Sequence, residues 1–291
     1  MREAVRFRRG LSDGFLAEIK AGRFSAILSA ATSRCLDVQI REHYLDIYAD
    51  GCCVLKLEER QSAPGSYWAS IHHKFLDGVS LADDQGSRAR GSYVRFKASP
   101  AFIDTYVCSL DAILENSRRY VKPEAALEEQ MIRQSRCPSS PVLFIDRQVQ
   151  VYGIRRRADL IGVTVDPEAA ARVVLVELKQ GLDNRIQHLM DQMGAYRKTV
   201  APQGRLHCEV ASSYRTVVAQ KRELGLVPPA AAFPEGRPSV ECLLVLADYN
   251  TKSKLLGRLR ERARESSFGV KLILLEKDQY VLPPTDSWEA L

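Results

Sequence analysis

The sequence predicts a mixed α/β protein of two parts, a small antiparallel β-rich front domain followed by an α/β core. Three observations favour this fold class. The 291 residues, 45% of them hydrophobic, suffice for one large or two modest domains. Apolar and polar residues alternate in several segments between about 30 and 98, as in half-buried strands. From residue 123 onward, strand and helix patterns interchange, as they do in α/β domains.

The front domain is expected to open with an amphipathic helix broken near Gly22. Its apolar face would consist of Phe15, Ile19, Phe24, Ile27 and Leu28. Strand patterns then run through about residues 30–98, and the Asp50-Gly51 pair predicts a hairpin turn between two of them. Clusters of Gly, Ser and Asp at 61–66 and 83–92 predict loops.

A helix over about 99–117 is expected to connect the two domains, because its apolar residues keep a 3.6-residue period. We therefore place the domain boundary there, with residues 1–117 forming the accessory front domain and residues 118–291 forming the core domain.

The core domain is predicted to follow the order α, β, β, β, α, β, α, β. Its first helix begins at Pro123 and ends before Cys137-Pro138. The remaining elements are expected at 142–151, 157–165, 172–178, 184–198, 241–247, 252–265 and 270–275. An irregular stretch is expected between the 184–198 helix and the 241–247 strand, because it contains Pro202, Pro228, Pro229, Pro234 and Pro238.

Composition favours a cytoplasmic protein without a membrane partner. The N-terminus is charged throughout, and no segment approaches the roughly 18 apolar residues that span a bilayer. The seven cysteines are odd in number and form no C-x-x-C pair, so we expect mostly buried thiols instead of disulfides or a zinc site. The net charge of +6 is compatible with an anionic partner but does not demonstrate one.

Three charged residues near the ends of two predicted core strands suggest a reactive site. Glu177 and Lys179 are two residues apart on an apolar strand, so both side chains project to one face, and Leu178 projects to the other. If the preceding strand pairs with this one, Asp159 can lie beside Glu177 on the same face.

Two carboxylates and a backbone carbonyl form a hard oxygen site that suits Mg²⁺, which usually keeps several of its waters. An ammonium beside such a site could orient an attacking water and balance the charge of a phosphorane-like transition state. These parts indicate metal-assisted phosphodiester hydrolysis.

The Glu-x-Lys triplet is weak evidence by itself, since a second copy, Glu18-Ile19-Lys20, lies in the first predicted helix, where its charged residues do not share a face. Its position at the end of an apolar strand strengthens the copy at Glu177. The alternative is a structural ion network, in which Asp159 and Glu177 are neutralised by Arg156, Arg157 and Lys179.

Neighbouring helices offer supporting residues. On the helix that begins at Pro123, Glu128 falls within the apolar arc and Glu129 outside it, so Glu128 is the better candidate for a further acid that holds a metal-bound water. A border position that reaches solvent is the alternative for Glu128. Gln192 and Tyr196 share a helix edge and could contact a phosphate or base, although Tyr196 could instead belong to the core.

Asp159, followed after seventeen intervening residues by Glu177-x-Lys179, resembles the PD-(D/E)XK nuclease superfamily, also called restriction-endonuclease-like. Gln192-x-x-x-Tyr196 is similar to a motif of some of its exonuclease branches. The resemblance covers about residues 120–250 and departs from the superfamily's motif at Ala158, where a proline usually stands.

The resemblance implies an αβββαβ core with a mixed central sheet flanked by helices, Mg²⁺ or Mn²⁺ as cofactor, and DNA more often than RNA as substrate. It implies metal ligands at Asp159, Glu177 and the Leu178 carbonyl, a catalytic Lys179 and an auxiliary acid at Glu128.

We therefore expect a metal-dependent nuclease that hydrolyses DNA by means of metal-activated water. Arg157 belongs to a run of three arginines that could contact phosphates, together with Gln192 and Tyr196. The alternatives are a catalytically silent nuclease-fold protein that binds nucleic acid or a protein, and an assembly protein that works through its front sheet. That sheet could also mediate dimerisation, so a homodimer is one expected assembly.

Overall fold

The computed structural model describes residues 7–82, 88–150, 157–165, 172–181, 188–204, 206–250, 252–266, 268–275 and 280–290. The chain divides into two compact units. The front unit comprises Arg9–Glu129 and Glu223–Leu226, and the core unit comprises Met1–Arg8, Gln130–Arg222 and Val227–Leu291. The two units are groups of residues that lie close together, and the domain boundary predicted at residue 117 stays a prediction.

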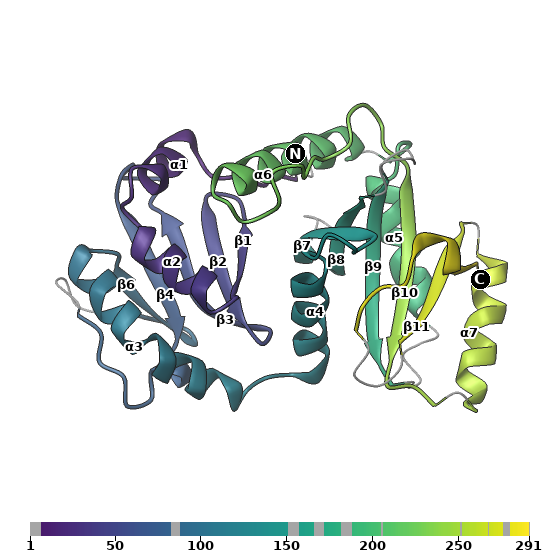
Figure 1. Ribbon diagram of the computed structural model, residues 1–291, viewed down its shortest axis with the longest axis horizontal. Coiled ribbons are helices and arrows are strands. Elements are labelled where there is room, and N and C mark those ends of the chain that lie inside the picture. Colours follow the sequence, from purple (N-terminus) through teal and green to yellow (C-terminus); the bar gives the residue numbers. More distant parts are fainter. Residues whose placement is uncertain are drawn as a thin grey trace, which may run out of the picture. The chain divides into compact units, whose positions relative to one another are not determined.

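The front unit contains one antiparallel sheet with the strand order β1-β2-β3-β4-β6-β5 (Figure 1). Its strands are β1 (Asp37–Ile40), β2 (Tyr44–Ala49), β3 (Cys52–Glu59), β4 (Tyr67–His72), β5 (Arg88–Arg90) and β6 (Tyr93–Lys97). The antiparallel sheet predicted over 30–98 is confirmed. The loop predicted at 83–92 is wrong at residues 88–90, because they pair with β6 as a short edge strand; residues 83–87 lie outside the described part.

Three helices pack on the apolar face of this sheet, namely α1 (Asp13–Lys20), α2 (Ser25–Ser33) and α3 (Pro100–Arg118). The ring of Tyr67 on β4 lies 4.7 Å from Phe15 of α1. Phe96 on β6 lies 5.3 Å from Phe102 of α3. The predicted break near Gly22 is confirmed, since Gly22 has a positive φ of 94° between α1 and α2.

The core unit contains a mixed sheet with the strand order β12-β11-β10-β9-β8-β7. Its strands are β7 (Val142–Gln150), β8 (Arg157–Thr164), β9 (Val173–Gln180), β10 (Val240–Ala247), β11 (Val270–Leu275) and β12 (Glu289–Ala290). β7, β8 and β9 pair antiparallel, whereas β9, β10 and β11 pair parallel. The predicted strands are confirmed to within a few residues at each end.

Helices lie before and between these strands. α4 (Pro123–Gln134) precedes β7, α5 (Leu189–Val200) and α6 (His207–Glu223) lie between β9 and β10, and α7 (Lys254–Glu265) lies between β10 and β11. α5 contacts β8, β9 and β10 and so covers the middle of the sheet (Figure 1). Residues 182–187, where the helix predicted at 184–198 would begin, lie outside the described residues.

The irregular structure predicted between residues 198 and 241 is wrong at His207–Glu223, which form α6. The prolines stand at 202 and from 228 onward, so the intervening chain is free to form a helix. α6 is anchored to a bulge of β7, where the register shifts between Phe144 and Asp146. Buried Lys221 donates to the Ile145 carbonyl at 2.8 Å, and the Tyr214 hydroxyl donates to Asp146 at 3.0 Å.

The cysteines are more exposed than their sequence context predicts. All seven are free thiols, but only Cys242 is buried; Cys52 and Cys53 are half-buried, and the other four are exposed. Burial raises the pKa of the Cys242 thiol to about 12, which keeps this group protonated at neutral pH. Among the described residues, no helix is long and apolar enough to cross a membrane.

The close approach of β7 to β8 depends on Gly162. A Cβ at this position would lie 2.6 Å from Val142 Cγ1 and 2.9 Å from the Leu143 carbonyl oxygen. We expect Gly162→Ala to lower the free energy of unfolding by about 1–3 kcal/mol, the usual cost of overpacking, as measured by urea denaturation.

Gly257→Ala is the matched control, because a Cβ at this α7 position meets nothing within 4 Å. A helical alanine there should leave stability unchanged or raise it by up to about 1 kcal/mol. Equal stability of Gly162→Ala and the unsubstituted chain would contradict the close packing of β7 on β8.

Candidate active site

Asp159 and Glu177 lie on neighbouring antiparallel strands. The pairing of β8 with β9 matches Leu160 with Val176, and continuing this register by one residue places Asp159 opposite Glu177. The Asp159 carboxylate accepts the backbone N–H of Leu178 at 2.8 Å. This bond fixes the Asp159 side chain against β9 at the point where Glu177 and Lys179 emerge.

The alternation of β9 separates the reactive residues from the core. Leu178 is fully buried on one side of the strand, while Glu177 and Lys179 project to the other side. The side chains of Glu177, Asp159 and Lys179 are 4%, 13% and 17% exposed. The site is therefore largely shielded from water, which strengthens the electrostatic interactions within it.

The Lys179 ammonium lies among the three predicted ligand oxygens. Its Nζ donates to the Leu178 carbonyl at 2.6 Å. The same nitrogen is 3.1 Å from Glu177 Oε1 and 3.9 Å from Asp159 Oδ2. Two carboxylates and one backbone carbonyl thus surround a single cationic atom.

Gln192 of α5 connects the helix to this cluster. Its Nε2 donates to Glu177 Oε2 at 2.8 Å and to the Arg157 carbonyl at 3.0 Å. Gln192 therefore holds one carboxylate oxygen of Glu177 while the other lies beside Lys179. The predicted phosphate-binding role of Arg157 stays a prediction; its side chain is exposed, and Arg156 lies outside the described residues.

Gln148 on β7 is a site neighbour that was not predicted from the sequence. Its Nε2 is 3.5 Å from Asp159 Oδ1, and its backbone has a positive φ of 48°. The sequence offered only a polar amide side chain within the predicted 142–151 strand. The positive φ, which is uncommon for a residue with a side chain, could not be read from the sequence.

Tyr196 packs inside the core unit. Its side chain is 2% exposed, and its hydroxyl donates to the Val149 carbonyl of β7. This contact matches the core alternative for Tyr196, and a substrate contact of its hydroxyl stays a prediction to be tested.

Glu128 and Glu129 lie on α4, within the front unit. Both are buried, at 2% and 1% exposure, although Glu129 falls outside the apolar arc of the helix. Glu129 Oε2 accepts the backbone N–H of Gly51 at 2.6 Å, a tertiary contact that helical periodicity cannot show. The burial of Glu128 does not match the solvent-reaching alternative, and its auxiliary role stays a prediction.

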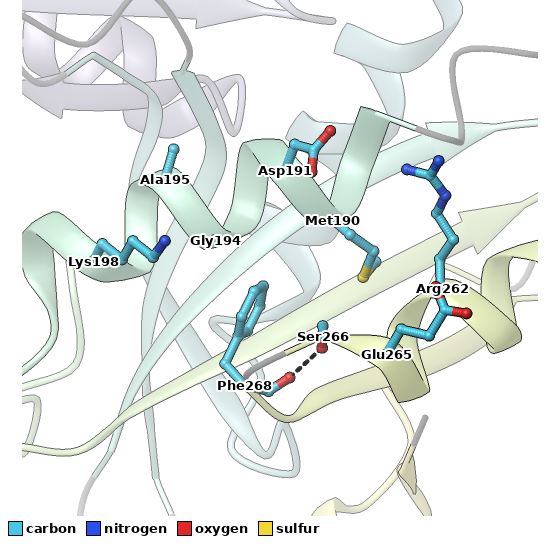
Figure 2. A pocket seen from close by; sticks show the side chains of 9 residues that line it. All are labelled: Met190, Asp191, Gly194, Ala195, Lys198, Arg262, Glu265, Ser266 and Phe268. Atoms are coloured by element: carbon cyan, nitrogen blue, oxygen red, sulfur yellow. Dashed lines mark hydrogen bonds between the residues drawn. The ribbon is translucent and has the colours of Figure 1, made fainter.

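A pocket of about 440 Å³ lies between α5 and the end of α7 (Figure 2). Asp191, Gly194 and Lys198 line it from the side of α5 opposite Gln192. The Phe268 ring is directed at Gly194, where a Cβ would approach it to 2.9 Å. The pocket carries both signs of charge, from Lys198 and Arg262 and from Asp191 and Glu265.

Among the described residues, no three His, Cys, Asp or Glu side chains form a metal-holding group. A divalent cation at the Asp159 site would therefore rely on two carboxylates, a carbonyl and water. That donor set suits Mg²⁺, which is usually held by one or two protein carboxylates.

No protein-family model and no curated protein matches this chain. Among solved structures, the chain is similar to a repair endonuclease from Pyrococcus abyssi, with 15% identity over 80% of this chain and 77% of that one. The TM-score of 0.22 is too low for this likeness to support either the fold or a function.

The role of Tyr196 can be tested by removing only its hydroxyl. Tyr196→Phe leaves the buried Val149 carbonyl without this donor, so we expect the free energy of unfolding to fall by about 1–3 kcal/mol. Any affinity of the chain for DNA should not change. Chemical denaturation and DNA titration of the same preparation measure both quantities. A variant of full stability with weakened DNA binding would instead indicate a substrate contact.

Proposed function

We propose that the core unit is a Mg²⁺- or Mn²⁺-dependent nuclease that hydrolyses DNA phosphodiester bonds. One observation carries the proposal. Asp159 Oδ2, Glu177 Oε1 and the Leu178 carbonyl lie 2.6–3.9 Å from a single point, which is marked by Lys179 Nζ. Oxygen atoms that converge on one cation are the geometry from which a hard metal site is built.

The residues fit such an ion. Asp159 and Glu177 would hold it through one carboxylate oxygen each, together with the Leu178 carbonyl. When bound, the ion would activate a water molecule and offset charge on the scissile phosphate. The ammonium of Lys179 would then have to move aside from these oxygens, which its flexible four-carbon side chain allows.

The chain's own residues would position and stabilise the reacting groups. Lys179 supplies a shielded positive charge next to the carboxylates, where it could stabilise the negative charge that develops on the phosphate. Gln192 fixes the orientation of Glu177, and the Leu178 N–H fixes that of Asp159. These bonds keep the carboxylates oriented before substrate arrives, so less reorganisation is needed during reaction.

The resemblance to the PD-(D/E)XK superfamily agrees with this assignment. Asp159, Glu177 and Lys179, which match the motif, are also the residues that cluster on β8 and β9. Ala158 in place of the motif's proline removes no ligand, since proline would supply none. α5 bears Gln192 against Glu177, as a residue that supports the site should.

Two alternatives share the same geometry. A structural ion network would use the Lys179 contacts without cleaving anything, and a silent nuclease fold would bind nucleic acid without hydrolysis. Both keep the charged cluster but predict no metal-dependent turnover, so an assay of cleavage separates them from the proposal.

The purified chain should cleave DNA in Mg²⁺ or Mn²⁺ and not in EDTA. Asp159→Ala and Lys179→Ala should each lower the rate at least about 100-fold, because each removes a charged group from the site. Gel assays on single-stranded DNA, duplex DNA and RNA would measure the rate and also identify the substrate.

Asp191→Ala and Lys198→Ala are the matched controls, since they remove exposed charges of the same kinds from the opposite side of α5. Both should retain the rate of the unsubstituted chain. Cleavage that persists in both Asp159→Ala and Lys179→Ala would rule out this site, and nucleic-acid binding without any cleavage would favour the silent fold.

A further inference from the structure

One half of the front sheet has a face that no part of the proposed nuclease mechanism uses. Cross-strand pairing aligns Trp68 with Lys97, Ser70 with Arg95, and His72 with Tyr93. β5 extends the same face by pairing Arg88 with Arg95 and Arg90 with Tyr93. We call this set the β4-β6-β5 face: Trp68, Ser70, His72, Arg88, Arg90, Tyr93, Arg95 and Lys97.

The strand period separates this face from the core. The alternate residues of β4, namely Tyr67, Ala69 and Ile71, are at most 1% exposed on the side where α1 and α2 pack. By contrast, Arg88, Arg90 and Tyr93 are exposed, and the other members of the β4-β6-β5 face are half-buried. The face therefore combines solvent access with side chains held by a regular sheet.

Aromatic rings occupy two positions on this face. The guanidinium of Arg95 lies 4.8 Å from the centre of the Trp68 ring. The rings of His72 and Tyr93 lie 5.3 Å apart, and Tyr93 is 40% exposed. His72 follows Trp68 by four positions on β4, so the two ring positions are about 13 Å apart along the strand.

His72 adds to the second ring position as a neutral ring. Burial lowers the pKa of its imidazole below the ordinary value, and the neighbouring Lys74 ammonium lowers it further. At neutral pH it is therefore mostly uncharged, as a stacking surface for a base should be.

The β4-β6-β5 face is mainly basic. Four of its eight residues are arginine or lysine, and its acidic neighbour is Glu58 of β3, which pairs with Trp68 across the strands. Arg95 pairs with Glu58 of β3 at 3.0 Å, whereas Arg88, Arg90 and Lys97 form no ion pair with any residue that the structure describes. Three cations on an accessible surface complement a polyanion.

The β1-β2 side of the same sheet differs. There Arg41 pairs with Asp46 at 3.3 Å, and the Tyr48 hydroxyl donates to the same carboxylate at 3.2 Å. Asp37, Gln39 and Arg41 are at most 3% exposed. Cations available to a ligand are therefore concentrated on β5 and β6.

We propose that the β4-β6-β5 face binds single-stranded DNA, with bases stacked on Trp68 and on the His72-Tyr93 pair and phosphates contacted by Arg88, Arg90 and Lys97. Stacking on aromatic side chains requires bases whose ring faces are bare, so a duplex fits this surface less well. The choice of DNA over RNA rests on the proposed nuclease function; the binding surface itself does not depend on catalysis.

The test is binding of a fluorescent oligodeoxythymidylate of about 16 nucleotides to the full chain in EDTA, measured by anisotropy. Trp68→Ala and Tyr93→Ala should each weaken binding about 5- to 100-fold, the usual effect of removing the ring under one stacked base. Trp68→Phe should retain most of the affinity, because a ring remains. Combined Arg88→Ala and Arg90→Ala should reduce the salt dependence of log K by about 0.7 for each phosphate that is no longer neutralised.

Tyr120→Ala is the matched control, because Tyr120 is 44% exposed in the same unit but lies outside the sheet. It should bind like the unsubstituted chain. Tyr93→Ala, at an exposed position, keeps the test valid if Trp68→Ala does not fold.

The stacking site would be overturned if the unsubstituted chain binds the oligonucleotide and Tyr93→Ala binds it as tightly as Trp68→Phe and Tyr120→Ala do. Equal affinity of the unsubstituted chain for a matched duplex would also overturn it, because that result would indicate attraction by charge alone. Tighter binding of oligouridylate, abolished in the same variants, would assign the face to RNA and reject DNA. Because EDTA prevents metal-dependent cleavage, failure of this site and failure of the nuclease proposal are measured separately.

Discussion

The contacts of the Lys179 ammonium with oxygens of Asp159, Glu177 and Leu178 are the interaction on which the rest of the site depends. They exist because an antiparallel pair brings Asp159 of β8 beside β9, and because Glu177 and Lys179 share one face of β9. Burial of two carboxylates is costly unless they are paired or hydrogen-bonded. Lys179, Gln192 and the Leu178 N–H supply those partners.

β7 on one side and α5 on the other contact this cluster. On β7, Gln148 has a positive φ and its side-chain amide lies 3.5 Å from Asp159 Oδ1. On the helical side, Gln192 bonds to Glu177 of β9 and to the Arg157 carbonyl of β8, while Tyr196 bonds to β7, so α5 is tied to three strands of the sheet. The charged residues are thereby kept in one place by backbone geometry, not by their mutual attraction alone.

Periodicity is sufficient to predict the strands and the relation of Glu177 to Lys179, because a strand has a strict two-residue alternation. The pairing of Asp159 with Glu177 follows if adjacent strands are hydrogen-bonded neighbours. α6 was not predicted, because prolines on both sides favour irregular structure although the segment between them contains none. The contacts of Glu129 and Gln148 were not predictable, because they depend on tertiary approach and on an unusual backbone angle.

The central claim is that Asp159, Glu177 and the Leu178 carbonyl form one cation site that Lys179 occupies when no metal is bound. Calorimetric titration with Mn²⁺ tests it most directly. The unsubstituted chain should bind Mn²⁺, Asp159→Asn should abolish that binding, and Lys179→Met should bind more tightly because the competing positive charge is gone. Unchanged Mn²⁺ affinity in Asp159→Asn would contradict the existence of this cation site. So would a failure of both the unsubstituted chain and Lys179→Met to bind Mn²⁺.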